Sequence, residues 1–267
     1  MNINKTKSFL SLITVFVLCI EAQAFSLLSQ KWNTGLNTAQ PMYNNLGTPG
    51  GASWSIMPPG LRFSPNSLSS ASVTSDFGLL LGGPTTIEEI TAISWAINTW
   101  SVACGFNNLG LVIDGNSNAG ASEALFGHIG DIRIGAINGF PIGTQARSWG
   151  PSTQALTGTI GGDIHFNNEI TWVDDPFAAP GSGVYDFHTS ALHEVGHALG
   201  LGHSTDVNSV MRLGYNGANR TLSEDDINGI RTVYGAPVPE PITSLIGVAG
   251  IAFAAFIKRK NSKTKTA

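Results

Sequence analysis

The spacing of hydrophobic positions predicts a small β-sheet accompanied by helices. Four short runs of aliphatic and aromatic residues are typical of strands: 52–56, 109–115, 131–137 and 162–166. Between them, apolar residues recur every three or four positions from Ile87 to Trp100, which predicts a helix that stops at Gly105. Thr86 and Glu89 have the spacing of a capping box at the start of this helix.

Two more helices are expected in the second half of the chain. One begins near Asp186 and has Leu192 and Val195 on its apolar face. The other begins at Ser223, with Asp226 three residues on at capping-box spacing, and ends at Gly235. The resulting order of strand, helix, strands, helix and helix predicts an α+β domain with a mixed sheet covered by helices.

The N-terminal segment 1–24 has the features of a secretory signal peptide. Two lysines precede an apolar run, Phe9–Ile20, and Ala22-Gln23-Ala24 provides a small-x-small cleavage site before Phe25. An uncleaved anchor is the alternative, although the run is short for a membrane span. Residues 25–50 are then expected to form an N-terminal linker or short pro-segment.

The C-terminal segment 236–267 has three ordered parts. Pro239-Glu240-Pro241 precedes an uncharged apolar stretch, 242–257, and Lys258-Arg259-Lys260 follows it. This arrangement resembles the PEP-CTERM sorting signal of Gram-negative bacteria, which implies removal by an exosortase-type protease after transient anchoring in the membrane. A permanent anchor is the alternative. In both cases the basic cluster would stay in the cytoplasm, so the protein is expected to be exported to the cell surface or beyond.

The composition between these two segments limits the partners of the domain. Residues 25–238 carry seven basic and sixteen acidic side chains, a net charge of −9, which argues against binding to nucleic acid. Cys104 is the single cysteine of this region, so no disulfide within the region is expected and the fold depends on its core and on any bound metal.

The stretch HEVGHALGLGH, residues 193–203, has the spacing of a metal site. His193 and His197 lie one helical turn apart, so both imidazoles project from one side of a helix. Gly200 permits a sharp turn that returns His203 as a third ligand. Three protein ligands and one open position are typical of catalytic zinc, and Glu194 is placed to act as a base for the attacking water. His128 and His188 have no partner at ligand spacing and are interpreted as surface or core histidines.

The motif HExxHxxGxxH resembles the metzincin zinc peptidases, and Ser204 directly after it resembles their matrixin branch. The resemblance runs from about Trp54 to Gly235, and it implies a metzincin-type catalytic domain over residues 51–235. Such a domain has a twisted mixed β-sheet, about three helices and a zinc cleft between an upper and a lower subdomain. It further implies that Met211 forms the Met-turn beneath the metal, and that Asp225 and Asp226 brace this region.

Several positions depart from the matrixin pattern. Arg212-Leu213 follows the methionine where the family has Tyr-Pro, whereas Tyr215 remains as an expected wall of the substrate pocket, opposite an edge strand that begins at Ala146. His165 is retained from a second, structural zinc site, but Arg147 stands at another of its histidine positions, so that zinc is not expected. Asp163 and Glu169 remain as possible calcium ligands. Residues 25–61 contain no Cys, Asp, Glu or His to cap a metal, so activity without proteolytic trimming is expected.

These features predict a zinc-dependent metalloendopeptidase that hydrolyses peptide bonds of extracellular proteins, with Glu194 as general base. Two alternatives to this prediction remain open: a non-catalytic zinc-binding surface module, and a zinc hydrolase that acts on cell-wall peptides. Retention of Glu194 argues against the first, because a purely structural metal site has no use for a base.

Overall fold

A computed structural model describes residues 23–33, 39–42, 45–61, 74–82, 86–115, 130–151 and 160–237. The predicted signal segment up to residue 22, His128 and the predicted sorting tail from residue 238 lie outside the described residues. Among the residues that are described, no helix has the length and apolarity needed to cross a membrane.

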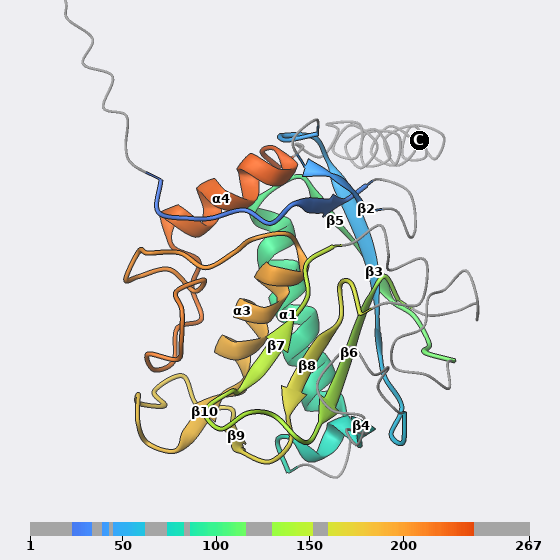
Figure 1. The fold of residues 1–267 in the computed structure, drawn as a ribbon, viewed down its shortest axis with the longest axis vertical. Helices are drawn as coiled ribbons and strands as arrows, with labels where there is room; N and C mark the ends of the chain where they lie inside the picture. Colours follow the sequence, from blue (N-terminus) through green and yellow to red (C-terminus); the bar gives the residue numbers. More distant parts are fainter. Residues whose placement is uncertain are drawn as a thin grey trace, which may run out of the picture.

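A six-stranded mixed sheet forms the centre of the molecule (Figure 1). Its main path is β5 (Phe106–Leu111), β3 (Gly50–Ile56), β6 (Ile132–Ile137), β8 (Ile164–Asn167) and β7 (Ala146–Ser148), with β4 (Thr74–Ser75) paired to β6. The first four strands of this path are parallel, whereas β7 pairs antiparallel with β8 and β4 antiparallel with β6. The predicted mixed sheet is therefore confirmed, and β7 is one of its two edge strands.

The four predicted strands appear as β3, β5, β6 and β8, with shifted ends. β5 shifts most: it begins at Phe106, immediately after the preceding helix, rather than at residue 109. Phe106 pairs with Gly50 of β3, so the strand already starts there. From Phe106 onward its residues alternate between buried and more exposed positions, as in any half-buried strand. Two small sheets complete the strands: β1 (Gln30–Trp32) with β2 (Ala39–Pro41), and β9 (Thr171–Val173) with β10 (Val184–Asp186).

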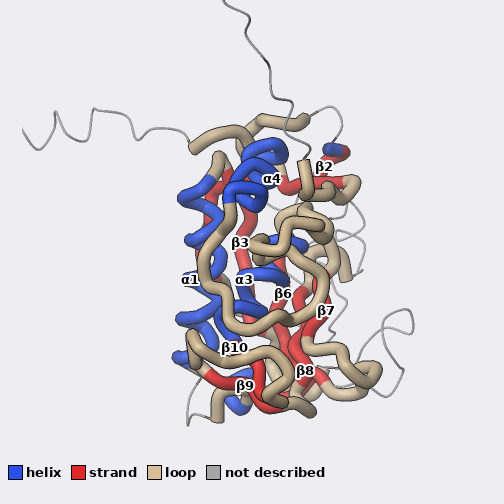
Figure 2. Tube along the Cα trace, turned by 90° about the vertical axis from the view of Figure 1, so that its left-hand side faces the viewer, coloured by secondary structure: helices blue, strands red, loops and turns tan. Residues whose placement is uncertain are grey.

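The described residues include three α-helices: α1 (Ile87–Ala103), α3 (Phe187–Ala198) and α4 (Glu224–Tyr234). Helices α1 and α3 lie side by side, and α3 also contacts β7 and β8 (Figures 1 and 2). Buried aromatic and aliphatic side chains fill the space between these helices and the sheet, and the indole N–H of Trp100 in α1 donates to the Leu192 carbonyl of α3 at 2.9 Å. This packing fixes α3 against the sheet, as expected for an α+β metzincin-type domain.

All three helices start where the sequence predicts, but the side-chain cap forms at only two of them. Ser223 and Asp226 form the expected capping box, and Asp186 caps α3. The box predicted at Thr86 does not form, because Glu89 instead accepts a hydrogen bond from the Leu81 backbone at 2.9 Å.

The predicted domain boundary at residue 51 is wrong, because the described residues before it are packed into the same domain. Trp32 is only 1% exposed, and its indole N–H donates to the Ala198 carbonyl at the end of α3 at 2.8 Å. Lys31 is fully buried and its Nζ donates to the Val233 carbonyl of α4 at 2.9 Å. The segment 25–33 is thus a structural part of the domain and not a linker.

Candidate metal centre and cleft

Helix α3 places His193 and His197 on one side and its apolar residues on the other. Asp186 fixes the start of the helix by accepting hydrogen bonds from the backbone of Thr189 at 2.9 Å and from its hydroxyl. Leu192 and Val195 are fully buried in the core, whereas the two histidines are only half-buried. Their spacing of one turn brings the rings together, with the two Nε2 atoms 3.1 Å apart.

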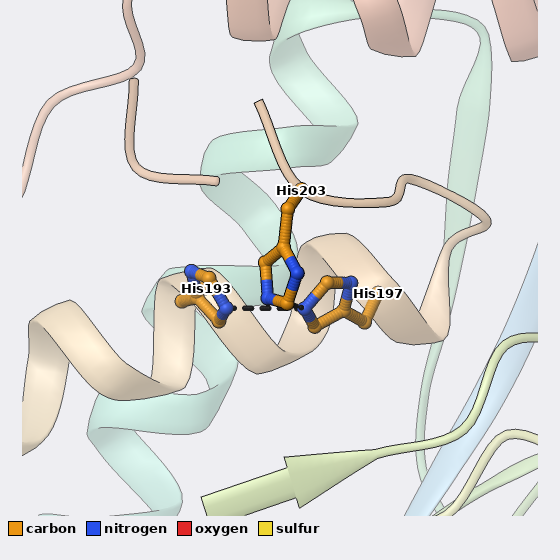
Figure 3. Close-up of side chains that lie close together, drawn as sticks. All are labelled: His193, His197 and His203. Carbon is orange, nitrogen blue, oxygen red and sulfur yellow. Dashed lines mark hydrogen bonds between the residues drawn. The ribbon is translucent and has the colours of Figure 1, made fainter. Parts of the chain in front are cut away.

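The turn at Gly200 returns the chain to the helix. Gly200 has φ of 109°, a conformation that favours glycine, and a Cβ there would lie 2.9 Å from the Gln30 carbonyl oxygen and from Met42 Cε. After this turn His203 faces the helix, and its Nε2 lies 3.2 Å from that of His197 (Figure 3). A ligand nitrogen from each of the three rings lies within 4.8 Å of the others, as a shared metal ion requires.

Backbone carbonyls orient two of the three rings. His193 Nδ1 lies 2.6 Å from the Val210 oxygen and His197 Nδ1 lies 2.7 Å from the Leu201 oxygen. A carbonyl can only accept, so each Nδ1 carries the proton and each Nε2 presents its lone pair toward the other rings. Burial lowers the pKa of His193 to about 4 and that of His197 to about 3, which keeps both in the neutral form that binds metals.

The N-terminal segment holds the stretch of chain that carries His203. Leu28 N donates to Gly200 O at 2.8 Å, Gly202 N donates to Ser26 O at 2.9 Å, and the Ser26 hydroxyl donates to His203 O at 2.7 Å. These contacts join positions about 175 residues apart in the sequence, and the sequence analysis did not identify them.

Glu194 is a buried carboxylate next to the three imidazoles. It is 7% exposed, and within the described part of the chain its Oε2 has no hydrogen-bond partner. Burial raises its pKa to about 8, an effect that the positive charge of Arg147 opposes. A carboxyl group with a pKa near neutrality is suited to exchange a proton during catalysis.

Met211 lies directly beneath helix α3. It is 1% exposed, and a Cβ added at Gly196, between the two helix histidines, would overlap its sulfur atom. The two acids of α4 have different partners. Asp226 accepts from the Val210 backbone at 2.9 Å and from the Ser209 hydroxyl, so it braces the segment that leads into Met211.

The bracing role implied for Asp225 is only indirect. Its carboxylate accepts from the Ser204 hydroxyl at 2.7 Å and from the backbone N–H groups of Ala24 and Phe25, both at 3.1 Å. Asp225 therefore joins the end of the histidine motif to the N-terminal segment, and Ser204 in turn donates its N–H to the Met211 carbonyl at 2.9 Å.

The three histidines and Glu194 line one cavity of about 920 Å³. Ala146 of β7 and Tyr215 line the same cavity, so the structure brings both predicted pocket residues beside the histidines. The Tyr215 hydroxyl accepts from the Asp186 N–H at 3.1 Å and donates to the Ala178 carbonyl at 3.3 Å, which holds this wall against the start of α3.

The two possible calcium ligands do not come together. Asp163 precedes the four-residue strand β8 and Glu169 follows it. At roughly 3.3 Å per residue the strand alone separates them by about 13 Å, far beyond the reach of one cation. Asp163 is buried 3.8 Å from His165, and Glu169 accepts from the Gly139 backbone at 2.9 Å. A calcium ion shared by this pair is therefore excluded.

A second group of possible ligands, Asp174, Asp186 and His188, has a different explanation. His188 Nδ1 lies 3.3 Å from Asp174, a contact that the sequence spacing did not suggest. The Arg220 guanidinium bonds to Asp186 and, at 2.7 Å, to Asp174, so a positive charge already stands between the carboxylates. This cluster is an ion-pair network that supports the N-terminus of α3.

Comparison with known proteins agrees with this geometry. Residues 138–235 match the matrixin family model. The chain is 40% identical over 99 residues to human matrilysin, covering 36% of this chain and 33% of that protein. It is 38% identical over 114 residues to horse interstitial collagenase, covering 42% of this chain and 22% of that protein. It is also 42% identical over 79 residues to human neutrophil collagenase, covering 28% and 16% of the two chains.

The chain thus spans about a third or less of the length of these relatives, and the residues that match the family model include the three histidines. Together with the mixed sheet and its three helices, these similarities support a matrixin-like metallopeptidase.

Proposed function

We propose that this chain is a zinc-dependent metalloendopeptidase in which His193, His197 and His203 hold one zinc ion. The observation that carries the proposal is the convergence of three Nε2 atoms at the wall of a large cavity, beside a buried carboxylate. The donor set fits zinc, because neutral imidazoles are typical ligands of catalytic zinc sites and two of the three are oriented by backbone carbonyls.

Glu194 is proposed to move the proton. Zinc, when bound, would supply Lewis acidity to a water molecule and to the scissile carbonyl. Glu194 Oε2 has no partner among the described residues, so it is available to take a proton from the attacking water. As the water oxygen adds to the carbonyl carbon and the C–N bond breaks, the same carboxyl group delivers that proton to the departing amine.

Strand β7 is proposed to bind the substrate backbone. It is an edge strand of the sheet, it contacts α3, and Ala146 at its start lines the cavity. An edge strand can pair with an extended peptide through main-chain hydrogen bonds, which holds the peptide without demanding a particular sequence. Tyr215 is proposed to line the side-chain pocket from the other wall.

The test is cleavage of an unstructured protein by the purified domain, with and without a chelator, and by Glu194→Gln. We expect one zinc per chain in both proteins, cleavage by the wild type that the chelator abolishes, and a loss of about 10²-fold or more in the variant. Glu224→Gln, which changes an exposed acid at the start of α4 outside the cavity, is the control and should retain activity. Near-normal turnover by Glu194→Gln would contradict the assignment.

The same assay separates the alternatives. A non-catalytic zinc module would contain zinc yet leave the protein substrate intact, and a hydrolase of cell-wall peptides would cleave only wall fragments.

The sequence of the two chain ends supports a proposal about location. Segment 1–24 would direct export, and an exosortase-type protease acting on residues 236–267 would bring the protein to the surface of a Gram-negative bacterium. Sequencing the N-terminus of the exported protein should find Phe25 first.

A further inference from the structure

The arginines of this domain are unevenly engaged. Five arginines are described, and three of them are held by protein groups: Arg133 by Asp114 at 2.8 Å, Arg231 by the Ala103 carbonyl at 2.8 Å, and Arg220 by Asp174 and Asp186. Each of these guanidinium groups therefore has a structural role.

The other two, Arg147 and Arg212, have no hydrogen bond or ion pair through their side chains within the described part of the chain. Both line the cavity that contains the three histidines. They reach it from two separate segments: Arg147 is exposed on strand β7, and half-buried Arg212 follows Met211. An arginine without a partner retains its full capacity to bind a carboxylate, which its planar fork does well.

The cavity is consequently cationic within an acidic chain. Among the described residues that line it, Glu194 is the only acidic one, whereas residues 25–238 together carry a net charge of −9. Three neutral imidazoles would leave the charge of a bound divalent ion uncompensated, which would add to the positive potential in the cleft.

We propose that Arg147 and Arg212 make the cleft selective for extended peptides that carry Asp or Glu side chains close to the scissile bond. The inference rests on the proposed peptidase function and adds its substrate class. Arg147 lies on the strand proposed to pair with the substrate backbone and lines the cavity, so its side chain would stand beside the side chains of a peptide bound along that strand. Arg212 presents the second charge from the segment that carries Tyr215.

The test uses quenched fluorescent peptides that differ only in Glu or Gln, placed in turn at each of the two positions on either side of the scissile bond. Exposed ion pairs are individually weak, so two of them together correspond to a preference of about twofold to 25-fold in kcat/KM for Glu at the best position. Because the preference is electrostatic, it should fall toward one as the salt concentration approaches 1 M.

Arg147→Gln/Arg212→Gln should reduce the Glu-to-Gln ratio to about one, and each single variant should reduce it in part. Arg231→Gln is the matched control, since Arg231 lies outside the cavity, and it should keep the wild-type ratio. Cleavage of Glu and Gln peptides at equal rates by the wild type, or a ratio that survives in the double variant, would overturn the selectivity while leaving the peptidase proposal standing. If none of the peptides were cleaved, both the selectivity and the peptidase proposal would be overturned.

Discussion

Replacing Asp226 by alanine should destabilise the domain severely, because this one carboxylate connects the last helix to the segment beneath the metal centre. Asp226 is 1% exposed and accepts hydrogen bonds from the Val210 backbone at 2.9 Å and from the Ser209 hydroxyl. It also accepts from the backbone N–H and the hydroxyl of Ser223, both at 2.8 Å, as the second half of the capping box.

The expected loss can be worked from these contacts. Alanine would leave the Val210 and Ser223 N–H groups without acceptors, and each unsatisfied donor in such a setting costs about 1–3 kcal/mol. The Ser223 N–H bond is the half of the capping box that the Asp226 side chain supplies, so the loss of this cap is already included. A total of about 3–5 kcal/mol is expected, which is a large share of the 5–15 kcal/mol that typically stabilises a domain.

Urea unfolding of the chelated proteins measures this difference. With a slope of about 2–3 kcal/mol per molar urea, a loss of about 4 kcal/mol lowers the midpoint by roughly 1.5–2 M. Glu224→Ala is the control, because Glu224 is exposed two positions earlier on the same helix. A change below about 1 kcal/mol in Asp226→Ala, or one equal to that of the control, would refute the bracing role.

Two other predictions concern the turn and the base. Gly200→Ala should cost about 1–3 kcal/mol of folding stability and weaken zinc binding. Gly214→Ala is the control: Gly214 also has a positive φ, 78°, but no atom lies within 4 Å of an added Cβ, so this variant should cost less and leave zinc binding intact. Calorimetry and zinc titration compare the two variants, and equal effects would argue against contacts at Gly200. In chelated protein the pKa of Glu194 is raised to about 8, whereas the ordinary pKa in the unfolded chain is about 4.5. Between these two values the folded state keeps a proton that the unfolded state has released, so folding stability falls as the pH rises toward 8. Glu194→Gln should therefore gain stability relative to the wild type between pH 5 and pH 8 in unfolding experiments, and a constant difference across this range would contradict the buried carboxylate.

The sequence predicted most reliably those features that depend on residues close together in the chain. The capping box of Ser223 and Asp226, the helix that carries two histidines and the glycine turn after it all follow from spacing within one or two turns. Even such local signals fail when a distant group competes, as at Glu89, whose carboxylate binds the Leu81 backbone instead of capping its own helix.

Contacts between distant segments could not be predicted in this way. Nothing in the spacing of Ser26 indicates that its hydroxyl binds the carbonyl of His203, or that Trp32 fills the space at the end of α3. Arg220 likewise occupies the space between Asp174 and Asp186 only because tertiary folding brings three separate segments together. These contacts depend on the complete packing of the domain, which hydrophobic periodicity does not describe.

X-ray absorption at the zinc edge tests the metal centre most directly. The protein loaded with one equivalent of zinc should show three imidazole nitrogens at about 2.0–2.1 Å and one additional light atom, and His203→Ala should lose one of the three imidazoles. A wild-type spectrum with only two imidazoles, or one that does not change in His203→Ala, would contradict the three-histidine site on which the proposed chemistry depends.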